Sequence, residues 1–266
     1  MGLGPMGCRH ARVLGSLGER YALVGGYDID ASASGVDGLA RLISEADAIE
    51  RSDVLVVSTP IQAHAATVQR ALLAGKHVLV EKPLCGRASE AEAMAAASVA
   101  SSARVFVGHS ERFNPVVRVL ARLIRVEPVL GIDLLRVGPS RPSECGVLLN
   151  LAVHDLDLAA YLGGGDATLR GAIGAPTSGA SGEDMAHVLL TTGSGALAHV
   201  HVDRTAPRRR REITVQTESW IYDGDLLSHR LTRTSRATGA PAEVPLPIEE
   251  PLAAQARALA DALDGG

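Results

Sequence analysis

Aromatic residues are scarce in this chain of 266 residues, because Phe, Trp and Tyr together make up only 3% of it. Hydrophobic residues of all kinds nevertheless make up 46%, and the mean hydropathy is +0.14. These values fit a globular protein whose core is built from Ala, Val and Leu. The length allows one or two domains.

Cysteine is scarce as well. Cys8, Cys85 and Cys145 are odd in number, lie far apart and form no C-x-x-C pair. This pattern gives no sign of a disulfide framework and favours reduced thiols in a cytoplasmic protein.

A strong charge imbalance and long apolar runs are also missing. The formal net charge is −4 and the isoelectric point is near 6.1, whereas a nucleic-acid-binding domain is usually strongly basic. We find no signal-peptide core and no apolar run of membrane-spanning length. Neither a nucleic acid nor a membrane is therefore an expected partner.

The first part of the chain alternates between strand and helix patterns. The helical segments include RHARVLGSL, AHAATVQRALLAG, which ends at Gly75, and SEAEAMAAASVASS; ASASGVDGLA is at most a short helix and RLI a small strand. The expected buried strands are YALVGGYD, SDVLVVSTP, KHVLVEKP and ARVFVGH. This alternation predicts an α/β fold with a doubly wound parallel sheet, a Rossmann domain, over residues 1–110.

After about residue 110 the pattern changes. FNPVVRVLARLI and GVLLNLAVHDLDLAAYLGG are expected to be helices, and HVLLTTG, GALAHVHVDR, REITVQTES and WIYDGDLLSHRLTR to be consecutive strands. We therefore expect a second, α+β domain over residues 111–266 with a mainly antiparallel sheet.

The opening MGLGPMGCRHARVL contains a G-x-G-x-x-G pattern at Gly2, Gly4 and Gly7 that leads into a helix. Asp28 follows about 20 residues later, at the end of the next expected strand. Such glycines let a dinucleotide pyrophosphate approach the helix N-terminus, and the carboxylate would bind the ribose hydroxyls and repel a 2′-phosphate. No Arg follows in IDASAS, so NAD is favoured over NADP, while a surface Asp in a turn is the structural alternative.

Two further segments carry candidate catalytic groups. Lys82 ends the strand HVLVEKP, at the carboxyl edge where ligands bind open α/β sheets, although a strand-end lysine can simply reach solvent. Asn150 and His154 are four apart and share a helix face. A histidine on an apolar helix is more often a core residue, and only its combination with Lys82 and a nucleotide loop makes it a candidate.

Two histidines and an arginine run have simpler explanations. His199 and His201 share one face of a strand, but two ligands without a third favour a hairpin surface, and we expect no metal. The run Arg208–Arg211 is expected to be a solvated turn; alternatively, it neutralises a substrate diphosphate.

Taken together, these segments resemble the glucose–fructose oxidoreductase, inositol dehydrogenase and rhizopine-catabolism (Gfo/Idh/MocA) oxidoreductases over nearly the whole chain. The resemblance rests on GLGPMGCRHARVL, YDID, VVSTPIQAH, AGKHVLVEKPL, VGHSERFNP and GVLLNLAVHDLDL in the family's order and spacing. RVGPSRP followed by GVLLNLAVHDLDLAAYLGG is similar to the branch that oxidises UDP-N-acetylglucosamine at the sugar 3-position.

The resemblance implies a role for each candidate residue. Lys82 would contact the reacting hydroxyl and the nicotinamide ribose, and His154 would be the general acid and base, which suits a group that titrates near neutral pH. The other residues implied to bind the cofactor are Gly2, Gly4, Met6, Gly7, Asp28, Thr59, Pro60, His64, Glu81, Arg112 and Asn114. Those implied to bind substrate, besides Lys82 and His154, are Arg136, Arg141 and Asn150.

The implied function is an NAD-dependent dehydrogenase that moves hydride from a sugar hydroxyl, with C3 of a UDP-N-acetylamino sugar as the expected position. An inositol or other polyol is the alternative substrate, and a truncated, catalytically silent nucleotide-binding paralogue is the alternative of another class. We also expect a homo-oligomer formed through the antiparallel sheet.

The chain departs from the family pattern in four places. Asn150 stands where the family often has Asp, and Ile61 where it often has Asn. No apolar strand precedes the glycines, and the chain stops at ALADALDGG, where the family usually continues into a helix that returns towards the nucleotide domain. Both ends therefore look truncated, and we expect the 266-residue chain to be poorly soluble or weak in cofactor binding.

Overall fold

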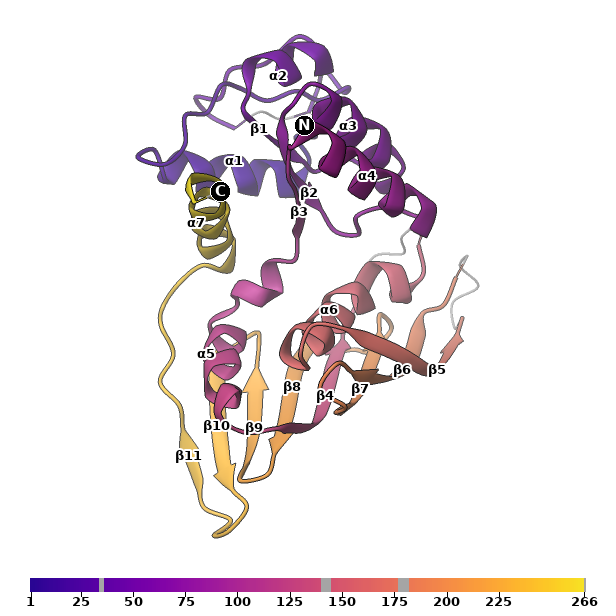
Figure 1. The fold of residues 1–266 in the computed structure, drawn as a ribbon, viewed down its shortest axis with the longest axis vertical. Coiled ribbons are helices and arrows are strands. Elements are labelled where there is room, and N and C mark those ends of the chain that lie inside the picture. The colour runs from indigo at the N-terminus through magenta and orange to yellow at the C-terminus, as the bar shows by residue number, and fades with distance from the viewer. Residues whose placement is uncertain (34–35, 140–144, 177–181, 266) are drawn as a thin grey trace. The chain divides into compact units, whose positions relative to one another are not determined.

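The computed structural model describes residues 1–33, 36–139, 145–176 and 182–265. Its backbone contacts divide the chain into two compact units (Figure 1). The first consists of residues 1–109 with the C-terminal segment from Leu252, and the second of Ser110–Pro251. None of the described helices is long and apolar enough to cross a membrane.

The first unit contains a parallel three-stranded sheet in the order β1-β2-β3. Its strands are nearly continuous apolar runs, and Val57, Val78 and Val80 are fully buried, as expected for strands covered on both faces. The elements of this unit are α1 (Pro5–Ser16), α2 (Glu45–Arg51), β1 (Val54–Val57), α3 (Ile61–Leu73), β2 (His77–Glu81), α4 (Ala88–Ser101), β3 (Val105–Gly108) and α7 (Pro251–Asp264).

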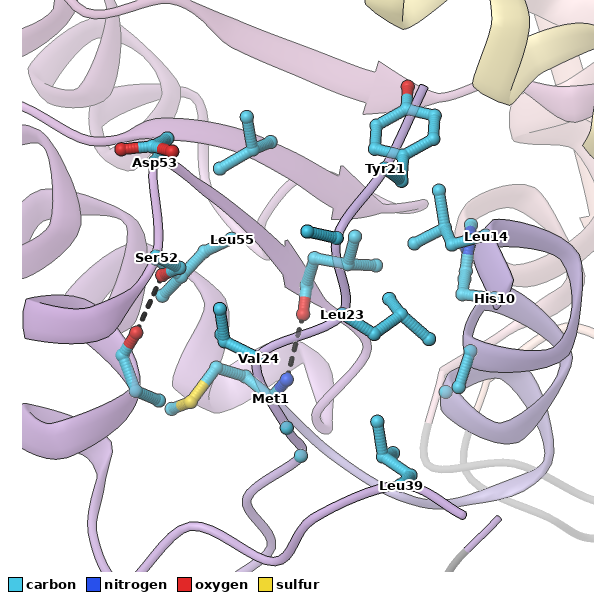
Figure 2. Close-up of a pocket in the computed structure, with 18 of the residues that line it drawn as sticks. Met1, His10, Leu14, Tyr21, Leu23, Val24, Leu39, Ser52, Asp53 and Leu55 are labelled. Carbon is cyan, nitrogen blue, oxygen red and sulfur yellow. Dashed lines mark hydrogen bonds between the residues drawn. The ribbon is translucent and has the colours of Figure 1, made fainter. Parts of the chain in front are cut away.

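The segment YALVGGYD does not form the expected strand. Only Gly26 pairs, in a single parallel bridge with Arg41, and no helix forms in the described part of ASASGVDGLA. The chain from Ala22 to Gly25 lies beside a cavity rather than beside a neighbouring strand (Figure 2). Without a strand to exchange hydrogen bonds with, an apolar run cannot become part of a ladder.

The C-terminal helix corrects the expected domain boundary. Leu252 and Ala256 of α7 pack against Val13 and Leu14 of α1, and the Tyr21 hydroxyl donates to the Ala256 carbonyl at 2.5 Å. A helix that returns to the nucleotide unit is therefore present within this chain. The apolar face of α7 packs against α1, and α7 therefore belongs to the first unit.

The second unit contains a mainly antiparallel sheet in the order β11-β10-β9-β8-β4-β7-β6-β5, in which β4 and β7 are parallel neighbours. Strands β4, β6, β7 and β8 alternate buried residues with more exposed ones, so that one face of the sheet is buried. The elements are η1 (Ser110–Phe113), α5 (Pro115–Leu123), η2 (Ile124–Val126), β4 (Val129–Val137), the π-helical turn η3 (Leu148–Ala152), α6 (Val153–Leu162), β5 (Ala167–Ala175), β6 (Met185–Thr192), β7 (Leu197–Asp203), β8 (Arg210–Thr217), β9 (Trp220–Asp225), β10 (Arg230–Ser235) and β11 (Pro241–Glu243).

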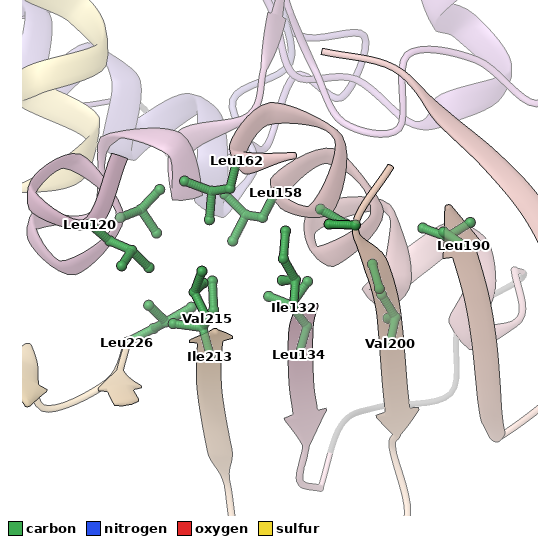
Figure 3. Packing of buried hydrophobic residues seen from close by; sticks show 14 of the residues in the cluster. Leu120, Ile132, Leu134, Leu158, Leu162, Leu190, Val200, Ile213, Val215 and Leu226 are labelled. Carbon is green, nitrogen blue, oxygen red and sulfur yellow. The ribbon is translucent and has the colours of Figure 1, made fainter. Parts of the chain in front are cut away.

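Helices α5 and α6 cover the apolar face of this sheet (Figure 3). Leu120 and Leu158 from the helices meet Ile132, Val200 and Ile213 from the strands, and each is nearly or fully buried. The segment WIYDGDLLSHRLTR, expected to be one strand, folds as the β9–β10 hairpin. This core fixes α6, which carries His154.

Candidate functional site

The glycine loop has the geometry that a nucleotide loop needs. Gly2 has a φ of +80°, and a Cβ there would lie 2.7 Å from the backbone of Ser58; a Cβ on Gly7 would lie 1.9 Å from the Gly2 carbonyl oxygen. These two glycines let α1 approach the sheet closely. Gly4, the N-cap of α1, instead has nothing within 4 Å of its Cβ position, and no side chain caps the helix. The first turn of α1, which contains Met6, therefore presents backbone amides beside open space, where an anion binds favourably.

Asp28 lies beside this loop. Its Oδ2 accepts a hydrogen bond from the Leu3 amide at 2.6 Å, and its Oδ1 accepts one from the Asp30 amide at 2.9 Å. The Asp28 carboxylate thus connects the glycine loop to the end of the extended segment 21–27. Its oxygens retain lone pairs that can accept hydrogen bonds from ribose hydroxyls.

Arg41 is a neighbour that the sequence analysis missed. Its guanidinium donates to the carbonyl oxygens of Asp30 at 2.6 Å, Ala33 at 3.1 Å and Asp28 at 3.3 Å. The absence of Arg from IDASAS does not, therefore, mean that no cation lies near Asp28. The one signal in the sequence for this contact is the small strand expected at RLI. The bridge between Arg41 and Gly26 brings Arg41 close to Asp28.

His64 connects the loops after β1 and β2. Its Nε2 lies 2.8 Å from the Thr59 carbonyl oxygen and its Nδ1 lies 3.0 Å from the Pro83 carbonyl oxygen. Only 2% of the surface of His64 is exposed, and its two contacts position the loops that contain Thr59 and Pro83. Pro60 lies at the N-cap of α3, and the neighbouring Thr59 Oγ1 is buried without a hydrogen-bond partner, as a group awaiting a ligand would be.

Glu81 is occupied by contacts within the protein. Its Oε1 lies 2.7 Å from His10 Nε2 of α1, and its Oε2 accepts from the Lys82 amide at 3.2 Å. Both Glu81 and His10 are buried. Glu81, which is expected to shape the nicotinamide pocket, therefore also positions α1 against the end of β2. The next residue, Lys82, is half-buried.

A buried charge cluster lies under α6 in the second unit. Arg136 Nε and Nη2 donate to Asp155 at 2.7 and 3.0 Å, and its Nη1 donates to Glu111 at 3.2 Å. Arg211 also donates to Glu111, at 3.0 Å. Burial raises the pKa of the Asp155 carboxyl, and the positive charge of Arg136 opposes that shift.

Arg136, which is expected to bind substrate, lies in this cluster. Only 4% of Arg136 is exposed, and Asp155 and Glu111 are similarly buried. Its nitrogens bind two carboxylates, and these contacts position α6. Asp155 lies between apolar residues of an expected helix, and no local pattern in the sequence indicates that its partner is Arg136, 19 positions earlier.

His154 follows the π-helical turn that contains Asn150, and both side chains are partly exposed. On the same helix, Asp157 binds Arg112 through two bonds of 2.7 and 2.5 Å, and the Arg112 guanidinium lies 4.9 Å from the centre of the Tyr161 ring. Ion pairs at Asp155 and Asp157 therefore hold the part of α6 that follows His154.

Asn114, expected in the cofactor site, has a structural role in this chain. Its Oδ1 accepts from the Val116 amide at 3.1 Å and caps α5, and its Nδ2 donates to the Leu226 carbonyl at 3.0 Å. Asn114 is 3% exposed. Arg141, expected to bind substrate, lies outside the described residues.

The candidate residues thus fall into two groups. Gly2, Gly4, Gly7, Asp28, Thr59 and Lys82 belong to the first unit, and Arg112, Asn150 and His154 to the second.

Three histidines line up on the uncovered face of the second sheet. His187 Nδ1 lies 3.1 Å from His199 Nε2, and the rings of His187 and His201 stack at 4.1 Å. Burial lowers the pKa of His201. Among the described residues, no group of three or more His, Cys, Asp or Glu side chains has the geometry of a metal site.

Comparison with known proteins agrees with this geometry. Residues 1–109 match the oxidoreductase family with an NAD-binding Rossmann fold, and residues 136–221 match the Gfo/Idh/MocA C-terminal domain. The chain is 26% identical to the UDP-N-acetylglucosamine 3-dehydrogenase of Acidithiobacillus ferrooxidans over 92% of this chain and 79% of that protein. It is 26% identical to the inositol 2-dehydrogenase of Rhizobium meliloti over 77% of this chain and 68% of that one.

The fold agrees as well. A solved structure of the Acidithiobacillus ferrooxidans UDP-N-acetylglucosamine 3-dehydrogenase superimposes with a TM-score of 0.90 at 25% identity, covering 99% of this chain and 87% of that one. The nucleotide loop and the sheet domain thus match the two domains of one family in the same order, and the chain belongs to the Gfo/Idh/MocA family of NAD-binding oxidoreductases.

Proposed function

We propose that this chain oxidises a hydroxyl-bearing carbon of a sugar, with Lys82 and His154 as its catalytic residues. The observation that carries the proposal is the loop at Gly4, where the uncapped first turn of α1 faces open space while Gly2 and Gly7 pack tightly. Such a loop suits the pyrophosphate of a dinucleotide, and this family is NAD-binding.

The residues present fit NAD at three points. The amides at the start of α1, around Gly4 and Met6, would hold the pyrophosphate, and Asp28 would accept hydrogen bonds from the adenosine ribose. Thr59 Oγ1, buried without a partner, would gain one from the bound cofactor. NAD supplies the hydride acceptor of the reaction.

The chain's own residues then handle the proton. As the hydride leaves the carbon, the His154 imidazole takes the hydroxyl proton, and the CH–OH group becomes a carbonyl. The Lys82 ammonium donates to the same oxygen and stabilises its developing negative charge. The pairs Arg136–Asp155 and Arg112–Asp157 hold α6 so that the imidazole keeps its orientation.

For the substrate we propose a UDP-N-acetylamino sugar, oxidised at C3. The similarity of the RVGPSRP run and the match to a UDP-N-acetylglucosamine 3-dehydrogenase support this choice. Arg211 adds a physical reason, because its side chain is 41% exposed while it contacts Glu111. It can therefore offer a cation to a diphosphate. Asn150 is proposed to contact the sugar.

The test is NADH formation from NAD with UDP-N-acetylglucosamine and, separately, with myo-inositol at matched concentrations. Turnover only with the nucleotide sugar supports the proposed substrate, whereas turnover only with inositol supports the polyol alternative suggested by the inositol dehydrogenase relative. NAD binding without turnover on either would favour a catalytically silent paralogue.

We also propose that the uncovered face of the second sheet joins copies of this chain. Ile173, Leu189 and Leu197 are 72%, 53% and 69% exposed, and they lie on the three neighbouring strands β5, β6 and β7. A patch of large apolar side chains on one sheet face is typical of a protein interface. A second copy would cover it by the same face.

A further inference from the structure

The helix that carries Asn150 and His154 begins without a cap of its own. Its first turn is η3, and α6 continues it from Val153. Val147 occupies the N-cap position, and its apolar side chain forms no capping hydrogen bond. The first amides of a helix have no partner within that helix, so acceptors for them must come from another segment.

Glu183, which lies shortly before the start of β6, supplies these acceptors. Its backbone carbonyl accepts a hydrogen bond from the Val147 amide at 3.0 Å, and its Oε1 accepts one from the Leu148 amide at 2.8 Å. A carboxylate is favoured further at this position, because the amides at a helix start carry a partial positive charge. One residue thus binds two successive amides where the helix begins.

Two glycines allow this close contact. A Cβ on Gly146 would lie 2.2 Å from Glu183 Oε1, so a larger residue there would displace the carboxylate. Gly182 has a φ of +96°, and a Cβ on it would lie 3.0 Å from the Gly146 Cα. The Glu183 carboxylate therefore occupies the space that Gly146 leaves open.

The next residue, Asp184, anchors Glu183 to the sheet. The Arg204 amide donates to the Asp184 carbonyl at 3.0 Å, and Arg204 Nε donates to the Asp184 carboxylate. Asp184 is 0% exposed and Arg204 5%, and separating two such buried charges is strongly unfavourable. Arg204 Nη1 also donates to the Cys145 carbonyl at 3.4 Å, so one guanidinium holds both the segment of Glu183 and the residue that precedes Gly146.

We propose that Glu183 is a positioning residue for the oxidation, which sets where the helix that carries Asn150 and His154 begins. The ion pairs of Asp155 and Asp157 hold this helix after His154, and Glu183 holds it before His154. A displacement of the helix start is therefore carried to the imidazole, and a misplacement of about 1 Å can lower a rate by about 10²-fold. This inference rests on the proposed catalytic role of His154.

The kinetic test compares three variants. Glu183→Ala removes the acceptor, Glu183→Gln keeps an oxygen in its place, and Glu243→Ala is the matched control, because Glu243 binds Arg230 on the exposed surface. We expect Glu183→Ala to lower kcat by about 10- to 100-fold while the Kd for NAD changes by less than about twofold. Glu183→Gln should recover most of the kcat, and the control should match the unsubstituted chain. An unchanged kcat in Glu183→Ala would overturn the proposal.

Gly146→Ala displaces the same carboxylate without removing it. We expect it to lower kcat as Glu183→Ala does, and the double variant to be no slower than Glu183→Ala alone, because the clash is gone once the carboxylate is removed. Losses that multiply in the double variant would show that the two residues act separately, and this result would overturn the proposal. Gly146→Ala also provides the measurement if Glu183→Ala does not fold.

Two further readouts need no turnover. They are amide hydrogen exchange at Leu148 and the imidazole resonances of His154 in a pH titration by NMR. We expect Glu183→Ala to speed the exchange at least about tenfold and to shift the His154 resonances, and Glu183→Gln to do neither. Unchanged exchange and resonances would overturn the positioning role, whereas an unsubstituted chain without turnover on any sugar would contradict the proposed oxidation alone.

Discussion

Arg136 Nε lies 2.7 Å from Asp155 Oδ2, one residue after His154 and almost fully buried. The family resemblance implies a substrate contact for Arg136, and in the structure Arg136 also binds Asp155 on the helix that carries the proposed catalytic His154. The pair therefore has a predictable effect on stability. Removing Asp155 leaves the buried Arg136 with Glu111 as its remaining carboxylate partner, and removing Arg136 takes away the cation that Asp155 binds in its buried position.

We expect Asp155→Asn to lower the free energy of unfolding by about 3–5 kcal/mol. Replacing both partners by apolar residues, Arg136→Met with Asp155→Leu, should lower it by less than Asp155→Asn alone. Urea unfolding measures both. If Arg136→Met left stability unchanged but raised the KM for the sugar, Arg136 would be a substrate contact after all.

The second prediction concerns the cofactor. Asp28→Ala should weaken NAD binding and relax the preference for NAD over NADP, because it removes ribose hydrogen bonds and the repulsion of a 2′-phosphate. Titration of both cofactors measures the ratio of the two Kd values. Arg41→Ala is the informative control, because the Arg41 guanidinium lies beside Asp28. Tighter binding of NADP than of NAD by the unsubstituted chain would contradict the role given to Asp28.

The third prediction concerns the catalytic residues. Lys82→Ala and His154→Ala should each lower kcat by about 10²–10⁴-fold and leave the Kd for NAD nearly unchanged. Lys76→Ala and His229→Ala serve as matched controls, since Lys76 donates to a carbonyl on the surface and His229 lies in the β9–β10 turn. Near-native turnover of His154→Ala between pH 6 and 9 would show that another group takes the proton.

The fourth prediction is a pH dependence of stability. Burial lowers the pKa of the Met1 amino group from 8.0 to about 6. Between these values the unfolded chain binds more protons than the folded one, so stability should rise with pH from 6 to 8, by about 2–3 kcal/mol, and level off above 8.

Chemical acetylation of the Met1 amine removes this titration and leaves all histidines in place, including His201. The difference between the acetylated and free chains in urea unfolding at pH 6, 7 and 8 therefore isolates the amine. If the free energy of unfolding depended on pH equally in the acetylated and free chains, the buried position of the Met1 amino group would be contradicted.

The fifth prediction concerns assembly. Leu197→Glu places a charge on the uncovered face of the second sheet, and we expect it to reduce the oligomer to monomers in light scattering. Leu73→Glu is the matched control, because Leu73 is 83% exposed but lies on α3 of the first unit. A monomeric unsubstituted chain would contradict the proposed interface.

The sequence by itself determined the elements whose signals are local. The spacing of Gly2, Gly4 and Gly7, the apolar runs of β1 and β2, the close of α3 at Gly75 and the alternation of β6 to β8 all follow from neighbouring residues. Turn preferences and side-chain periodicity depend on residues within a few positions of one another. These elements can therefore be predicted from the sequence without knowledge of the tertiary structure.

Only the tertiary structure decided the roles that depend on distant partners. Arg41 reaches Asp28, Glu81 binds His10, Arg136 binds Asp155 and α7 packs on α1, and in each case the two residues lie 13 or more positions apart. YALVGGYD has the composition of a strand, yet it forms no ladder. A strand exists only when a neighbour supplies its hydrogen bonds, and that neighbour is a property of the fold and not of the segment.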